Sequence, residues 1–129
     1  MTTSRVNPEE LPRDAPPLFS RDRGDTPVRG YEIIGSHYEH LFGVDSAGQV
    51  WLVDPDGEEP PVFVNGSVQQ FASAVKIFEP AWRAMGPDEV VVDQIVQITA
   101  AFEQIDQAAL ADAGTFWSVV LEQVEDGLF

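Results

Sequence analysis

The sequence predicts an α+β fold in which an N-terminal antiparallel sheet, a meander, packs against C-terminal helices. Residues 30–65 consist of short apolar or alternating segments separated by turn residues, whereas residues 66–127 carry apolar residues at spacings of three and four. When strands come first and helices follow, the helices generally pack on one face of an antiparallel sheet. With 129 residues, 43% of them hydrophobic, the chain can bury one core and not two.

A proline-rich segment precedes the predicted strands. Residues 1–29 contain five of the ten prolines and equal numbers of acidic and basic residues. This composition favours an extended or disordered chain. We therefore expect a flexible lead-in over residues 1–15, without regular structure, and a single domain over residues 16–129. Three apolar side chains are available to dock the lead-in on the domain: Leu11, Leu18 and Phe19.

Four short strands are expected, over residues 31–34, 38–44, 49–54 and 62–64. Gly35 and Ser36 are expected to end the first strand. The tetrapeptides Asp-Ser-Ala-Gly at 45–48 and Asp-Pro-Asp-Gly at 54–57 have the composition of tight turns. The third strand is a nearly continuous apolar run around Trp51, which is typical of a strand covered on both faces.

The first predicted helix begins at Ser67, which is a favourable N-cap residue, and Gln70 completes a capping box. Its apolar stripe consists of Val68, Phe71, Val75, Phe78 and Trp82. Pro80 lies inside this stripe and is expected to kink or end the helix near Glu79.

Two further helices follow. Gly86 and Pro87 mark the end of one helix and the start of the next. The second helix has the stripe Val91, Ile95, Ile98, Phe102 and Ile105. After a short helical connector at 106–112, the last helix runs from its cap Thr115 to about Asp126 and ends at Gly127. It is expected to bury Phe116, Trp117, Val120, Leu121 and Val124.

Charge is the most informative feature for function. The net charge is −15, and all of the excess falls in residues 30–129, which hold 17 acidic residues but only Lys76 and Arg83 as bases. Such a surface repels nucleic acid, because binding of the phosphate backbone depends on Lys and Arg. It would attract a basic protein and accelerate its association. The alternative interpretation is that the charge only keeps the protein in solution.

The sequence contains no recognisable catalytic or metal-binding pattern. His37 and His40, placed three apart on one strand, would point to opposite faces and could not share a metal. Residues 54–59 resemble the start of a calcium loop, but Glu59 and Asn65 stand where that loop requires Gly and Glu. There is no cysteine, nucleophile elbow or phosphate-binding glycine loop. We therefore expect no catalytic residues, no cofactor, no metal and no enzymatic activity.

The remaining candidate is a protein-binding surface on the outer side of the meander. Acidic residues around a large apolar anchor suit a basic protein partner. The predicted contact residues, chosen from charge placement, are Glu39, Asp45, Trp51, Asp54, Asp56, Glu58 and Glu59. The competing interpretation is that Trp51 belongs to the core and that the acids are ordinary surface residues. No apolar segment is long enough to span a membrane, and the first thirty residues lack a signal-peptide core, so we expect a cytoplasmic protein.

The order of these features resembles the SUKH superfamily, in particular its actinobacterial fourth immunity subfamily. The resemblance covers roughly residues 16–128. It rests on Pro16-Pro17-Leu18-Phe19, the strand pair at 45–52, the junction at 64–71, Ile105-Asp106, and the closing helix at 116–122. One departure is Gly66, where the family pattern has Ser and where the turn before the helix should be looser.

The resemblance implies a mixed, strongly bent sheet wrapped by helices. It also implies an immunity protein that blocks a toxin, commonly a nuclease or a nucleic-acid deaminase with a basic substrate groove. The alternative is a non-catalytic interaction or regulatory scaffold of the same fold. A third possibility, an acidic hydrolase, would need paired carboxylates in a pocket, which the sequence does not reveal.

Overall fold

The computed structural model describes residues 8–15, 18–21, 27–84 and 89–126, with the side chains of residues 8 and 89–92 left out. In these ranges five strands precede three α-helices, so the α+β prediction is confirmed. The strands are β1 (Ser20–Arg21), β2 (Glu32–His37), β3 (His40–Val44), β4 (Val50–Val53) and β5 (Val62–Asn65). The helices are α1 (Val68–Ala84), α2 (Glu89–Ile105) and α3 (Phe116–Glu125), with 3₁₀ turns η1 (Pro8–Glu10) and η2 (Gln107–Leu110).

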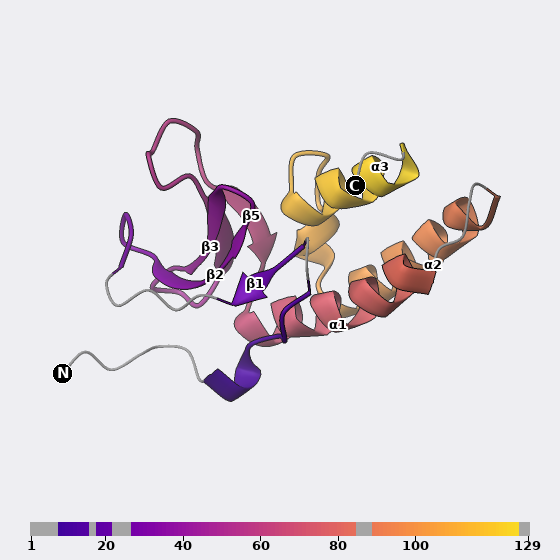
Figure 1. Cartoon of the computed structure of the whole chain (residues 1–129), viewed down its shortest axis with the longest axis horizontal. Coiled ribbons are helices and arrows are strands. Elements are labelled where there is room, and N and C mark those ends of the chain that lie inside the picture. The colour runs from indigo at the N-terminus through magenta and orange to yellow at the C-terminus, as the bar shows by residue number, and fades with distance from the viewer. Residues whose placement is uncertain (1–7, 16–17, 22–26, 85–88, 127–129) are drawn as a thin grey trace.

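The strands form one sheet in the order β1-β2-β3-β4-β5, and each described pair is antiparallel. Of the antiparallel and mixed arrangements considered from the sequence, the antiparallel one is found. In such a meander the β2–β3 and β4–β5 connections lie at one end of the sheet, and the β3–β4 connection lies at the other. Figure 1 shows the sheet towards one end of the molecule's long axis and the helices extending towards the other.

The first predicted strand, residues 31–34, corresponds to β2. The prediction that Gly35 and Ser36 end this strand was wrong. Strand β2 continues through both residues to His37, with a shift of register between Ile33 and Gly35. The reason is a close approach: a Cβ atom on Gly35 would collide with the ring of Phe19 and lie 2.7 Å from the carbonyl oxygen of Ser20. Glycine is therefore required where β1 and the preceding Phe19 lie against β2.

The second predicted strand, residues 38–44, corresponds to β3. It begins at His40, two residues later than predicted, because Tyr38 and Glu39 form a tight hairpin turn. His37 and His40 face each other across this hairpin as Cα partners. The expectation that they lie on one strand and point to opposite faces was therefore wrong, since directly paired residues share a face.

Helix α1 begins as predicted. The Ser67 hydroxyl accepts the backbone N–H of Gln70 at 3.1 Å and donates to the Gln70 side-chain oxygen at 3.2 Å. Pro80 does not end the helix, which continues to Ala84. Ala81 and Trp82 pack against the core beyond the exposed proline, and this packing offsets the one backbone hydrogen bond that proline removes.

The predicted stripes of the helices are confirmed at their described side chains except Ile105, which is partly buried and lies outside the core cluster. The stripe residues with less than one tenth of their surface exposed are Val68, Phe71, Val75, Phe78, Ile98, Phe102, Phe116, Trp117, Val120, Leu121 and Val124. Trp82 and Ile95 are partly buried against the core. The connector contains η2, as expected. Thr115 is the N-cap of α3, although its hydroxyl bonds to Ser118 instead of a backbone amide. The predicted signals at Gly86, Pro87 and Gly127, and the side chain of Val91, lie outside the described residues.

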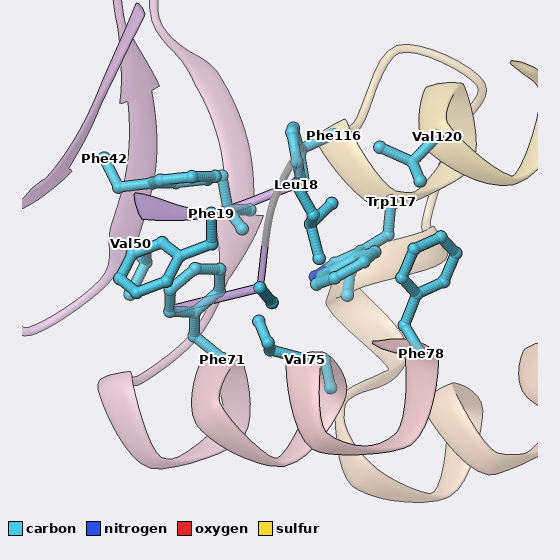
Figure 2. Close-up of a cluster of buried hydrophobic side chains, with 14 of the residues drawn as sticks. Leu18, Phe19, Phe42, Val50, Phe71, Val75, Phe78, Phe116, Trp117 and Val120 are labelled. Atoms are coloured by element: carbon cyan, nitrogen blue, oxygen red, sulfur yellow. The ribbon is translucent and has the colours of Figure 1, made fainter. Parts of the chain in front are cut away.

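The six largest fully buried side chains in the described ranges are aromatic, and the core includes part of the proline-rich segment of residues 1–29. Phe19, which is fully buried, lies 5.5 Å from Phe42 and 5.4 Å from Phe71 between ring centres (Figure 2). Leu18 and Leu11 are also buried, so docking of the lead-in is confirmed. The expectation of no regular structure before residue 16 was wrong, because η1 forms at Pro8–Glu10. A domain boundary at residue 16 stays a prediction.

A buried hydrogen-bond network joins the sheet to the helices. The side-chain amide of Asn65 donates to Asp106 Oδ2 at 3.1 Å, and the backbone N–H of Gly66 donates to the same oxygen at 2.8 Å. The indole N–H of Trp117 donates to Asn65 Oδ1 at 2.8 Å. All three side chains are at least nine-tenths buried. The network therefore connects the end of β5 and the residue after it with Asp106, which precedes η2, and with the first turn of α3.

Candidate functional site

The predicted contact residues fall into two groups in the structure. Glu39 and residues 54–59 belong to the β2–β3 and β4–β5 connections, which lie at the same end of the sheet. A contact joins the start of β3 to the β4–β5 connection, because His40 Nε2 lies 3.5 Å from Glu59 Oε2, a pair that is ionic when His40 is protonated. Asp45 begins the β3–β4 turn at the opposite end. Trp51 lies on β4 and is linked to Asp45.

Asp54 organises the acidic loop of residues 54–59. Its Oδ1 accepts the backbone N–H of Asp56 at 3.0 Å, and its Oδ2 accepts those of Glu58 and Glu59 at 3.1 Å. Hydrogen bonds to the ionised form lower the pKa of Asp54 below its usual 3.8, with the bond from Asp56 making the largest contribution. Gly57 adopts the positive φ of 72° that the predicted turn required. The carboxylate of Asp54 is thus engaged by the backbone amides of its own loop.

Asp45 has a similar structural role at the other end. Its Oδ1 accepts the backbone N–H groups of Ala47 and Gln49, both at 2.9 Å. Its Oδ2 accepts the indole N–H of Trp51 at 3.0 Å. Asp45 therefore closes the turn and fixes the orientation of the Trp51 ring.

Trp51 lies on the outer face of the sheet and is not part of the main core. It is half-buried and packs edge-to-face against Phe63 of β5, with ring centres 5.3 Å apart. Ile33 and Val53 are buried but lie outside the main core cluster. The outer face thus has a small apolar cluster of its own. The interpretation of Trp51 as a core residue was wrong, and its role in binding stays a prediction.

The acids that remain available for contact are Glu39, Asp56, Glu58 and Glu59, all of which are exposed. Other exposed acids are spread over the described lead-in, helices and connector: Glu9, Asp14, Asp93, Glu103, Asp112, Glu122, Glu125 and Asp126. One base approaches the acidic loop, since a Cβ atom on Gly57 would collide with the Arg29 guanidinium. Negative charge is therefore not confined to the predicted site, although it is dense there.

His37 is the most strongly perturbed base in the described residues, and its surroundings are structural. Burial lowers its pKa below 6.5, and the hydrogen bond from Nδ1 to the carbonyl oxygen of Leu18, at 2.7 Å, opposes that shift. Its ring packs edge-on against Phe116. Across the described ranges, no three His, Asp or Glu side chains form a group that could hold a metal ion. In the same ranges, no helix has the length and apolarity to cross a bilayer.

The residue that sequence reasoning missed is Tyr38. It was assigned to a strand, yet it occupies the hairpin tip and is 69% exposed. The signal in the sequence was weak, because a tyrosine is an unusual choice for a tight turn.

We expect that replacing Asp54 with Ala will loosen the acidic loop without unfolding the sheet. Its three backbone hydrogen bonds close this loop only, and the loop is exposed. Hydrogen exchange should accelerate at the amides of residues 56, 58 and 59. Because the pKa of Asp54 is lowered by folding, loop order should be complete above pH 3.8 and should be lost as the pH falls through the lowered value.

Asp56→Ala is the matched control, because it removes a neighbouring carboxylate and leaves the three bonds to Asp54 in place. Unchanged amide exchange in Asp54→Ala would show that the carboxylate does not hold the loop.

Comparison with known proteins identifies the family. The family model described as SUKH-4 immunity protein matches residues 7–123, which is most of the chain. Searches of curated proteins and of solved structures found no match. The matched range contains Asn65, Asp106 and Trp117, so the segments on which the resemblance rests build the buried network. The chain belongs to the SUKH-4 immunity protein family.

Proposed function

We propose that this protein is an immunity protein that binds and neutralises a cognate polymorphic toxin through an acidic surface. The observation that carries the proposal is the family match over residues 7–123. Immunity proteins of this kind act by stoichiometric binding and not by catalysis, so no catalytic residue is required. The protein would act in the cytoplasm, where an incoming toxin reaches its target. An actinobacterial source is part of the same proposal.

The charge of the chain supports a toxin that acts on nucleic acid. A nuclease or nucleic-acid deaminase binds phosphates with basic residues. A protein with a net charge of −15 can occupy such a basic groove, or can be steered to a site beside it. This charge also disfavours direct binding of nucleic acid by the chain itself.

A neutralisation assay tests the proposal. The toxin domain encoded beside the gene for this chain would be titrated with the purified protein while its nuclease or deaminase activity is followed. We expect inhibition that saturates at a fixed stoichiometry and an association rate that falls as salt rises. A toxin that stays active with excess protein, together with recovery of regulatory proteins in a tagged pull-down, would favour the scaffold alternative.

Charge reversal in the acidic loop should slow toxin association. The variant Asp56→Lys/Glu58→Lys/Glu59→Lys changes three exposed side chains and leaves Asp54 in place to hold the loop. We expect the association rate at low salt to fall about tenfold or more, because steering depends on the local potential. Stability should change little, since the contact of Glu59 with His40 is partly exposed and such surface pairs contribute little.

The matched control is Glu103→Lys/Glu122→Lys/Glu125→Lys, which makes the same change in net charge on exposed positions of α2 and α3. Surface plasmon resonance at two salt concentrations would compare the variants. An equal reduction in both would mean that only net charge matters. A reduction in the control alone would move the contact surface to the helices.

A further inference from the structure

We propose that Tyr38, at the tip of the β2–β3 hairpin, is the anchor residue that inserts into the basic surface of the toxin. This inference rests on the proposed function and adds the place and the residue of contact. It moves the centre of the interface from Trp51, which is half-buried and held by Asp45, to the end of the sheet.

Exposure singles out Tyr38. It is the most exposed large hydrophobic side chain in the described residues, at 69%, ahead of Val96 at 62% and Val119 at 37%. Tyrosine is enriched among the residues that dominate binding energy at protein interfaces, whereas valine is not. An aromatic ring that stays largely exposed in the fold is available for burial against a partner.

The backbone at this position indicates that a tyrosine is retained at a cost. Tyr38 has a φ of 54°, in the left-handed region that favours glycine. The β3–β4 and β4–β5 connections place Gly48 and Gly57 at their positive-φ positions, whereas the β2–β3 hairpin places a tyrosine there. Packing does not explain the choice, because the ring is largely exposed.

The ring is also held in position before any partner arrives. It packs edge-on against His37, with ring centres 4.6 Å apart. His37 is fixed in turn by its hydrogen bond to the carbonyl oxygen of Leu18 and by its contact with Phe116, at 5.2 Å between ring centres. A side chain that is already ordered loses less conformational entropy on binding, so more of its contact energy contributes to affinity.

Charge complementarity defines the partner. Glu39 follows Tyr38 directly, and the acidic loop of residues 54–59 lies at the same end of the sheet, with Glu59 Oε2 3.5 Å from His40 Nε2. The occupant we infer is therefore a basic protein surface with an apolar depression for the ring. A partner arginine stacked on the ring would add a cation–π contact, and its charge would be met by the neighbouring carboxylates.

Three single substitutions test the inference against the toxin used in the neutralisation assay. Tyr38→Gly removes the ring and relieves the positive φ, so the fold should be as stable as the wild type or more stable. Tyr38→Phe keeps the ring. Val96→Ala truncates the next most exposed side chain, on α2, and is the matched control. Affinity would be measured by calorimetry and stability by urea unfolding.

We expect Tyr38→Gly to weaken toxin binding by at least tenfold with no loss of stability, and Tyr38→Phe and Val96→Ala to bind like the wild type. Hydrogen exchange should show protection of residues 38 and 39 in the complex. If the wild type neutralises the toxin and Tyr38→Gly binds the toxin with unchanged affinity, this inference is overturned and the proposed function stands. If the wild type neutralises no toxin, the proposed function fails and the inference fails with it.

Discussion

Replacing Trp117 with Ala should destabilise the protein by about 3–5 kcal/mol, which is typical of large-to-small changes in a core. Trp117 is fully buried, with its ring centre 4.9 Å from that of Phe102 and 5.6 Å from that of Phe78. The substitution also leaves Asn65 Oδ1 without the indole N–H, its donor within the network. Because small domains have about 5–15 kcal/mol of stability in total, a large part of it should be lost.

Urea unfolding followed by circular dichroism would measure this change. Val119→Ala is the control on the same helix, since Val119 is 37% exposed and its truncation should cost less than about 0.5 kcal/mol. Trp117→Phe would retain much of the volume and lose the hydrogen bond, so its cost should fall between the two. A loss below about 1 kcal/mol in Trp117→Ala would contradict the assignment of Trp117 to the core.

Local periodicity predicted the elements that carry their own signal. The stripe Val68, Phe71, Val75, Phe78 is spaced for one face of a helix, and that face is buried. Ser67 caps the same helix because its hydroxyl needs only the amide three residues away. Such features depend on neighbours in sequence, so the sequence alone defines them.

Features that depend on distant contacts could not be predicted. Glycine commonly marks the end of a strand, but Gly35 lies inside β2 and leaves room for the ring of Phe19, sixteen residues earlier. Strand β1 forms only because it pairs with β2, and nothing in Ser20 or Arg21 favours a strand. Pro80 was expected to kink or end α1, but the helix continues past it, and the packing of Trp82 beyond it depends on the tertiary fold.

The candidate site shows the same division. The sequence predicted an acidic turn at 54–57, and the structure has that turn. It could not separate Asp54, whose carboxylate closes the loop, from Asp56, whose side chain is exposed. That difference depends on which oxygen meets which amide, and composition does not encode it. Tyr38 was missed for a related reason, since its exposure follows from the position of the hairpin turn.

The buried network joins segments that lie far apart in the sequence. Asn65 ends β5 and Asp106 follows α2, so forty residues separate two side chains that share a hydrogen bond. Gly66, which departs from the family pattern, donates its backbone N–H to the same carboxylate. A Cβ atom on Gly66 would lie 2.9 Å from Oε1 of Gln70, the side chain that binds the Ile105 carbonyl at 2.9 Å. Glycine therefore gives the Gln70 side chain room beside this junction.

Replacing Asp106 with Ala should destabilise the protein by about 3 kcal/mol. The substitution leaves the Gly66 N–H and the Asn65 amide without their acceptor in the interior, and each unsatisfied buried donor costs about 1–3 kcal/mol. Asp106→Asn keeps one acceptor oxygen and should cost less. Thermal and urea unfolding would measure both, with the exposed Asp93→Ala on α2 as the control, expected within about 0.5 kcal/mol of the wild type.

A double-mutant cycle would establish that these residues act together. If Asn65 and Asp106 stabilise the fold through one network, the cost of Asn65→Ala/Asp106→Ala should be smaller than the sum of the single costs by about 0.5–3 kcal/mol. Strict additivity would mean that the two side chains contribute separately. The junction would then be held by packing around Trp117 instead of by its hydrogen bonds.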